Sequence, residues 1–233
     1  MRALWLTLAV AAPGCGLLFD ATETPIPRLC DGEGEDLVLC LDFEDPIDDR
    51  IAVDSSRTGA SAELGAMVTQ VVRAERNLAI RVGAGDSAVD VPEHPALAFA
   101  GPFTIELTVS IEGGLLPVLV DHRPTYQLDT IAGGAVRCSS GVGLDNSVVT
   151  NGPIPPGFHR ITCVRDDKLR LYVDGLQQNQ IVDAAPPMPV LGPTFFGSNR
   201  NHMAQLTGTI DSVRFWNRAL TTPEIVARTE EAR

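Results

Sequence analysis

The residues best suited to chemistry in this sequence are its five cysteines: Cys15, Cys30, Cys40, Cys138 and Cys163. Structural zinc is held by cysteines and histidines at short, repeated spacings. No Cys-x-x-Cys or His-x-x-x-His pair occurs, and the four histidines are scattered singly. The spacing therefore favours disulfide chemistry over a zinc site.

The N-terminus bears on this choice, because disulfides persist mainly in exported proteins. Met1-Arg2 is followed by an apolar run that is too short to span a bilayer but long enough for a secretory signal. Gly14 and Cys15 then resemble the end of a bacterial lipobox, where a small residue precedes a lipid-modified cysteine. We expect residues 1–14 to be a lipoprotein-type signal peptide and Cys15 to be the lipid anchor. The alternative is an ordinary signal peptide cleaved nearby.

Without Cys15, four cysteines remain, which is an even number in a chain with an export signal. They allow three pairings, and we favour the local one, Cys30–Cys40 and Cys138–Cys163, because each partner is the nearest in sequence. Each bridge would contribute about 3 kcal/mol in the chain-entropy model. Residues 15–35 carry prolines and acids with little periodicity, and we predict that they form a linker closed off by the Cys30 bridge.

Charge and missing motifs exclude several function classes. The formal net charge is −12, so a nucleic acid would approach against the protein's own field. The sequence contains no Gly-x-Ser-x-Gly elbow, phosphate-binding loop or dinucleotide fingerprint. We therefore predict neither nucleic-acid binding nor the hydrolase, nucleotide-dependent or dinucleotide-dependent activities that these motifs serve.

The elements that must position any site are predicted to be short strands. The chain has 21 Gly and 17 Pro, which suits many tight turns. Residues 103–111 alternate apolar and polar, so one strand face should be buried and the other wet. Other β-rich runs cover residues 37–43, 68–72, 78–82, 88–91, 126–131, 135–138, 143–149, 159–164, 169–173, 195–197 and 207–216. Such strands without crossover helices indicate a two-sheet sandwich.

One helix is predicted near the C-terminus. Thr221 can cap it, Pro223 falls in the first turn, and Glu224 lies three residues after the cap, as a capping box requires. Ile225 and Val226 would give the helix an apolar side.

Three stretches, taken together and in order, carry a family resemblance. They are residues 87–106 (SAVDVP, PAL, GPFTIE), residues 157–175 (GFHRIT, LRLYVDG) and residues 206–225 (LTGTIDSVRFWNRAL and the helix start). They resemble the laminin-G-like jelly-roll family of the concanavalin-A-like lectin/glucanase superfamily. Phe158 stands where the family usually has Trp, and Arg57-Thr58 where Gly-Asn is usual. The resemblance implies an all-β, two-sheet antiparallel jelly-roll sandwich over residues 36–228, with a short C-terminal helix and a tail at residues 229–233.

The superfamily includes glycosidases, whose chemistry requires paired carboxylates. Retaining members carry a Glu-x-Asp-x-x-Glu cluster, because two carboxyl groups must flank the glycosidic bond about 5–5.5 Å apart. Here Glu106 is alone on its strand, while Asp42, Glu44 and Asp45 sit beside the start of the domain. We therefore expect no catalytic activity, and a glycoside hydrolase is a remote alternative.

The resemblance also implies a calcium site. Many relatives hold this ion where the polar loop after the first strand meets the strand with the Ile-Asp motif. The matching carboxylates here are Asp54 and Asp211, with carbonyl groups around Arg57 and Gly59 as further oxygen ligands. We therefore predict one structural Ca²⁺ at this place. The alternative is that Asp54 closes an Asx turn and Asp211 faces solvent or pairs with Arg214.

The family uses its sandwich faces and rim loops to hold glycans, proteins or glycosaminoglycans. Tyr172 and Trp216 lie in core-forming motifs, which leaves Tyr126, Phe195 and Phe196 as candidate aromatic platforms for a sugar. The resulting prediction is an exported, non-catalytic module at the bacterial cell envelope (outer membrane or cell surface) that recognises glycans. Its contact with the membrane would be through the lipid anchor only. The alternative is a module that contacts an extracellular protein or has a structural role in the envelope.

Overall fold

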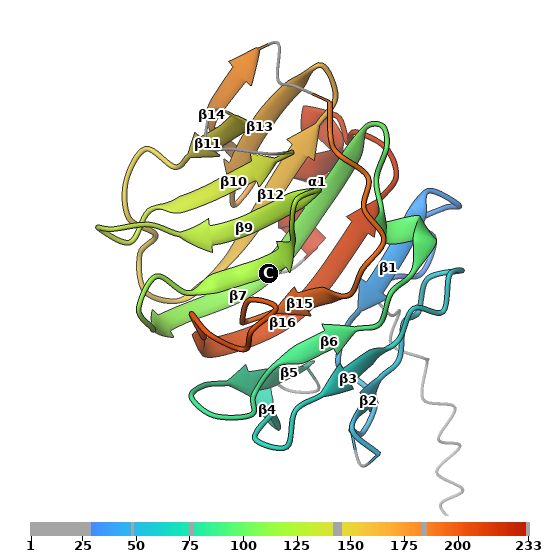
Figure 1. The fold of residues 1–233 in the computed structure, drawn as a ribbon, viewed down its shortest axis with the longest axis vertical. Coiled ribbons are helices and arrows are strands. Elements are labelled where there is room, and N and C mark those ends of the chain that lie inside the picture. Colours follow the sequence, from blue (N-terminus) through green and yellow to red (C-terminus); the bar gives the residue numbers. More distant parts are fainter. Residues whose placement is uncertain (1–28, 48, 75–76, 142–145, 183–185, 232–233) are drawn as a thin grey trace, which may run out of the picture.

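Strands dominate the chain and form two eight-stranded antiparallel sheets packed face to face (Figure 1). This arrangement confirms the predicted two-sheet sandwich. The computed structural model describes residues 29–47, 49–74, 77–141, 146–182 and 186–231. The predicted signal peptide, Cys15 and the linker up to residue 28 lie outside the described residues. Within these ranges, no helix has the length and apolar character needed to cross a membrane.

The first sheet is built from β1 (Leu37–Leu41), β4 (Thr69–Ala74), β5 (Asn77–Val82), β7 (Phe103–Gly113), β12 (Phe158–Arg165), β13 (Lys168–Val173), β14 (Leu176–Val182) and β16 (Thr207–Trp216). Their order is β14-β13-β12-β7-β16-β5-β4. The long strand β16 has two partners on one side, because β5 pairs with its first part and β1 with its last part.

The second sheet contains β2 (Ile51–Ala52), β3 (Ala62–Leu64), β6 (Val89–Val91), β8 (Val118–His122), β9 (Tyr126–Thr130), β10 (Val136–Ser140), β11 (Ser147–Val149) and β15 (Thr194–Phe196). Their order is β11-β10-β9-β8-β15-β6-β3-β2. A 3-10 turn, η1 (Pro95–Leu97), precedes β7. The sequence patterns had not indicated β2, β3, β8 or β14.

The core lies between the two sheets and is crossed by a disulfide. Ile105 and Leu107 of β7 are fully buried in the same cluster as Leu128 of β9. The Cys138–Cys163 bridge joins β10 of the second sheet to β12 of the first. The other bridge, Cys30–Cys40, ties the segment before the domain to β1. The structure thus contains the local pairing.

The outer face of the first sheet is also buried, which differs from the prediction for residues 103–111. Thr104, Glu106, Thr108 and Ser110 were expected to face water, but each is less than 9 % exposed. At Thr104 and Glu106 the reason is that segments from the chain ends cover this face. Thr104 accepts a hydrogen bond from the Leu220 backbone, in the segment that leads into helix α1 (Thr222–Glu231). In Figure 1 this helix lies behind the first sheet, on the side away from the second.

The start of α1 has the predicted capping geometry. The backbone N–H of Thr221 donates to the Glu224 carboxylate at 2.7 Å, as in a capping box. Ile225 is buried against the sheet, whereas Val226 is 44 % exposed. Of the two residues expected to form the apolar side of the helix, only Ile225 does so. The helix continues to Glu231, beyond the expected domain end at residue 228.

Candidate functional site

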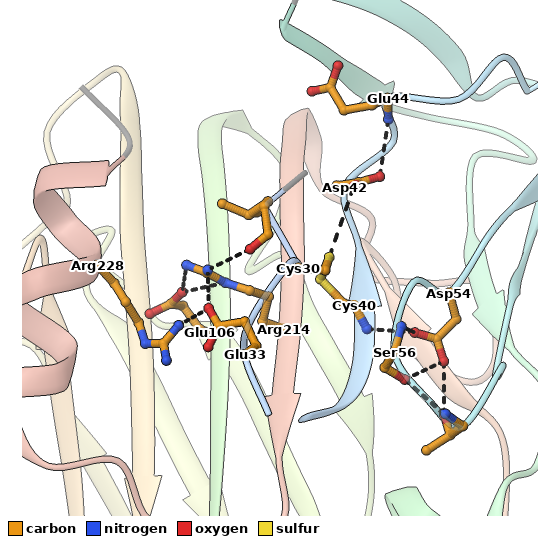
Figure 2. Close-up of a disulfide and its surroundings, with 12 residues drawn as sticks. Cys30, Glu33, Cys40, Asp42, Glu44, Asp54, Ser56, Glu106, Arg214 and Arg228 are labelled. Atoms are coloured by element: carbon orange, nitrogen blue, oxygen red, sulfur yellow. Dashed lines mark hydrogen bonds and ion pairs between the residues drawn. A yellow bond between two sulfur atoms is a disulfide. The ribbon is translucent and has the colours of Figure 1, made fainter. Parts of the chain in front are cut away.

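Glu106 of β7, a strand that also carries Glu112 near its end, is locked in a charged cluster with the chain ends. Arg214 of β16 donates to the Glu106 carboxylate (Nε to Oε1, 3.0 Å) and, through Nη1, to Glu33 at 2.9 Å. Arg228 of α1 also contacts Glu33. Figure 2 shows these four side chains converging from β7, β16, α1 and the segment before β1. Thr162 donates a further hydrogen bond to Glu106.

The electrostatics of this cluster assign Glu106 a structural role. Burial alone would raise the pKa of Glu106, but the guanidinium groups of Arg214, Arg160 and Arg228 outweigh it and hold the pKa below its ordinary value. A general acid needs a raised pKa, and Glu106 is only 2 % exposed. Glu33 belongs to the predicted linker, residues 15–35, so the last part of that linker is fixed against the sheet.

Asp54, the first predicted calcium ligand, closes a turn. Its carboxylate accepts hydrogen bonds from the backbone N–H groups of Cys40, Ser56 and Ala60, each at 2.8 Å. The hydroxyl groups of Ser56 and Thr58 add two more, at 2.8 and 2.9 Å. Part of this arrangement is visible in Figure 2. Five donors occupy the two oxygens, which is the geometry of the Asx-turn alternative.

Asp211, the second predicted calcium ligand, pairs with Arg73 and not with Arg214, the partner considered from the sequence. Its Oδ2 accepts from Arg73 of β4 at 2.6 Å. Burial raises the pKa of Asp211, and Arg73 opposes that shift. Asp54 and Asp211 share no hydrogen-bond partner, and no group of three or more His, Cys, Asp or Glu among the described residues could hold a metal ion. The calcium site stays a prediction.

A pocket of about 370 Å³ lies where the end of β8 meets β15. We call it the β8–β15 pocket, and it is lined by His122, Arg123, Pro124, Val190, Leu191, Gly192, Pro193, Phe195 and Arg200. Phe195 and Asp121 are paired in the ladder between the two strands, next to the core pair Phe196 and Val120. Because side chains alternate along a strand, Phe195 and Asp121 lie on the face away from the core.

The charged wall of the pocket is held by the buried carboxylate of Asp121. Arg123 donates to both of its oxygens, from Nε at 2.8 Å and from Nη2 at 2.9 Å. The backbone N–H groups of Arg123 and Arg200 each donate at 3.1 Å. Burial would raise the pKa of Asp121, but these hydrogen bonds hold it below its ordinary value. Arg123 is thus fixed in place while its side chain stays 45 % exposed.

The opposite wall is fastened by neutral hydrogen bonds. Nε2 of His122 lies 2.9 Å from the Val190 carbonyl, which can only accept, so Nε2 carries the hydrogen. Nδ1 therefore accepts from the Thr194 hydroxyl at 2.8 Å. Burial lowers the pKa of His122, which favours this neutral form. Thr125 donates to the Met188 carbonyl at 2.7 Å. Both walls of the β8–β15 pocket are therefore preformed.

Only one of the three predicted aromatic candidates reaches this pocket. Tyr126 and Phe196 are core residues, 1 % and 0 % exposed, whereas Phe195 lines the pocket. The two arginines of this pocket, Arg123 and Arg200, were not identified from the sequence. Arg123 carried a local signal, since it lies two residues after Asp121, but Arg200 is 77 residues away from Arg123, and its side chain donates to the Arg123 carbonyl.

A second cavity, of about 350 Å³, is lined by loop residues at the far end of β7. Its wall is largely glycine and aliphatic, including Gly113, Gly133 and Leu115. Its one carboxylate, Glu112, is engaged by Arg81 at 2.6 and 3.0 Å. This cavity offers fewer directed polar groups than the β8–β15 pocket.

The sequence from residue 83 to 226 matches the family Laminin_G_3, described as the concanavalin A-like lectin/glucanases superfamily. This stretch is more than half of the 233 residues. The chain belongs to the concanavalin A-like superfamily. The fold described above is therefore that of a concanavalin A-like domain. No curated protein sequence matches the chain significantly.

Solved structures with the same fold include three of interest. The binding domain of Paraclostridial Mosquitocidal Protein 1 is 16 % identical, with a TM-score of 0.67 over 84 % of this chain and 52 % of that one. A second structure is from botulinum neurotoxin type C, a toxin whose cell entry depends on interaction with two ganglioside molecules. It is 11 % identical, with a TM-score of 0.63 over 85 % of this chain and 51 % of that one. Domain 4 of AbnA, an arabinanase from Geobacillus stearothermophilus, was solved with arabinotriose and is 15 % identical (TM-score 0.66; 83 % and 98 %). This concanavalin A-like chain thus spans about half of each toxin chain and nearly all of the AbnA domain.

Proposed function

We propose that this chain is an exported, non-catalytic binding module that recognises a glycan in the β8–β15 pocket. The observation that carries the proposal is the Arg123 guanidinium, which is held by a buried carboxylate and remains half-exposed in a preformed pocket. Small-molecule sites combine apolar walls with a few fixed polar groups. Here the apolar part is supplied by Leu191, Pro193 and Phe195.

Structural neighbours support a glycan ligand. The AbnA domain was solved with arabinotriose, and the botulinum type C title names gangliosides. Both ligands are carbohydrates or carry them. We extend this ligand class to the present chain as part of the proposal.

The pocket wall supports a non-catalytic role. A glycosidase needs two carboxyl groups beside the scissile bond, and no Asp or Glu occurs among the described residues that line the β8–β15 pocket. Glu106, the acid considered for such a role, is buried under Arg214 on the first sheet.

Export is supported by the two disulfides, since such bonds persist in oxidising compartments. The proposal places the protein at the bacterial cell envelope with a lipid on Cys15. If so, the wild-type protein partitions with membranes and Cys15→Ser is released in soluble form. An unmodified N-terminus in the intact mass of the mature protein would contradict this part of the proposal.

The glycan proposal is tested with the mature protein on a glycan array, followed by calorimetric titration of the ligands that bind. A hydrogen bond to a charged group contributes about 1.5–3 kcal/mol, so Arg123→Gln should weaken binding by about tenfold or more. Arg81→Gln, which removes a surface ion pair outside the pocket, should bind as the wild type does. An array without hits, or an Arg123→Gln variant that is folded and binds normally, would refute the glycan proposal.

A further inference from the structure

The charge of the β8–β15 pocket is opposite to that of the chain. The protein has 18 Lys and Arg against 30 Asp and Glu, a net charge of −12. Yet both charged residues in the pocket wall are arginines, Arg123 and Arg200. The Asp121 carboxylate beneath them is only 1 % exposed, so it presents almost no negative surface to a ligand.

The two other arginines at this end of the sheet, Arg123 and Arg137, already have carboxylate partners. Arg123 neutralises Asp121, and Arg137 neutralises Asp129 on the adjacent strands. His122 is neutral in its hydrogen-bonded form. Asp90, which is paired with Phe195 in the ladder on the other side of β15, lies 3.5 Å from His202. Of the three arginines, Arg200 is the one without a carboxylate partner among the described residues.

The Arg200 guanidinium has N–H groups available to donate to a ligand. One of its terminal nitrogens donates to the Arg123 carbonyl, which orients the guanidinium at the pocket rim. Within the described part of the chain, it forms no ion pair with a carboxylate. A guanidinium presents several N–H donors in a fixed plane that matches a carboxylate in bidentate fashion. Arg200 therefore offers an open site for an anionic group.

We infer that the glycan bound in this pocket is an acidic sugar, with its carboxylate paired to Arg200 and flanked by Arg123. The sugar ring would lie against the apolar wall formed by Leu191, Pro193 and Phe195. Such a ligand has a carboxylate on one side and C–H groups on its ring faces, as uronic and sialic acids do. This inference rests on the proposed glycan-binding function and narrows its ligand class.

The test compares each acidic sugar with its own methyl ester, which keeps the ring and removes the charge. Oligogalacturonate, oligoglucuronate and sialyl-oligosaccharide are titrated into the mature protein beside their esters and beside a sulfated oligosaccharide. At least one acid should bind about tenfold or more tightly than its ester, because one charge-assisted pair is at stake. Added salt should reduce that advantage.

Arg200→Gln should abolish the preference for the acid over its ester, and Arg81→Gln should leave that preference as in the wild type. Equal binding of acid and ester, or a preference that survives Arg200→Gln, would refute the inference while leaving glycan binding in place. Preference for the sulfated sugar would refute the carboxylate assignment. Binding of no sugar at all would instead refute the proposed function, and this inference with it.

Discussion

Arg214 is 1 % exposed although it carries a charge, and two carboxylates depend on it. Breaking a buried ion pair by removing one partner costs about 3–5 kcal/mol, because the other charge is left buried and uncompensated. We expect Arg214→Leu to lower the free energy of unfolding by about this amount. The measurement is urea denaturation followed by tryptophan fluorescence.

The matched control for this variant is Arg81→Leu, which breaks an ion pair with Glu112 whose partners are 48 % and 41 % exposed. Exposed pairs contribute about 0–1 kcal/mol, so the control should lose no more than this. Similar losses for both variants would show that the Glu106–Arg214 contact adds nothing beyond a surface pair. Replacing Glu106 and Arg214 together by Leu should recover part of the loss, because the Glu106 carboxylate is then no longer buried without Arg214.

Among individual residues, those of the β8–β15 pocket were the hardest to predict from the sequence. Phe195 could be proposed from its type, and the Asp121–Arg123 pair from its spacing. Arg200 could not, since its backbone reaches Asp121 across 79 residues of sequence. What brings them together is the pairing of β8 with β15, and a single sequence contains no periodic signal for which two strands will be neighbours. Burial of Tyr126 and Phe196 likewise depends on that packing.

Among the elements, helix α1 depends on the residues at its start. Glu224 accepts from the Thr221 backbone N–H and hydroxyl, each at 2.7 Å, and from Arg218 at 2.7 Å. The hydrogen bond from Arg218, together with those from Thr221, lowers the pKa of Glu224 to about 2. Its folded pKa is thus below the unfolded value of 4.5. The stabilisation is therefore present above pH 4.5 and is lost as the pH falls toward 2.

We expect Glu224→Ala to destabilise the protein by about 1 kcal/mol at neutral pH, as loss of a helix cap does. The difference from wild type should shrink as the pH is lowered from 5 toward 2, because the wild-type carboxylate becomes protonated. Thermal melting at several pH values measures both effects, with the exposed Glu93→Ala as control. A difference that does not change with pH would contradict the role given to the carboxylate.

The strands show where sequence patterns succeed and fail. Alternation located β7 correctly, but it could not reveal that Thr104 and Glu106 are buried, because the segments that cover them come from the distant chain ends. The edge strand β14 has the sequence LQQNQIV and is exposed at most positions. It forms through hydrogen bonds to β13 and not through an apolar face, so no hydrophobic pattern marks it. The apolar run in β8 was a usable signal that the prediction missed.

For the molecule as a whole, the Cys138–Cys163 bridge matters because it joins the two sheets through the core. It closes a loop of 25 residues, against 10 for Cys30–Cys40. The chain-entropy model gives about 3.5 kcal/mol for the longer loop and about 2.7 kcal/mol for the shorter. We expect Cys138→Ala with Cys163→Ala to lose at least the larger amount, and Cys30→Ala with Cys40→Ala the smaller.

Urea titrations of the two paired variants provide the measurement. Both sulfur atoms of the Cys138–Cys163 bridge are fully buried, so its removal also leaves a small void that adds to the loss. A loss below about 1 kcal/mol for this pair would be far outside the usual range for a native bridge and would mean that packing alone holds the sheets together.

The Cys30–Cys40 bridge also determines how the domain carries mechanical load. Tension applied to the chain before Cys30 passes through the sulfur–sulfur bond directly to Cys40, inside β1. Residues 31–39 are therefore bypassed, and the Glu33 contacts with Arg214 and Arg228 carry none of the force. From Cys40 the force enters the ladder between β1 and β16, where Cys40 is paired with Arg214. The first contacts to bear load are those of the Cys40 backbone, whose N–H donates to the Asp54 carboxylate and whose carbonyl accepts from the Ser55 N–H. The segment before β1 thus cannot be peeled away residue by residue.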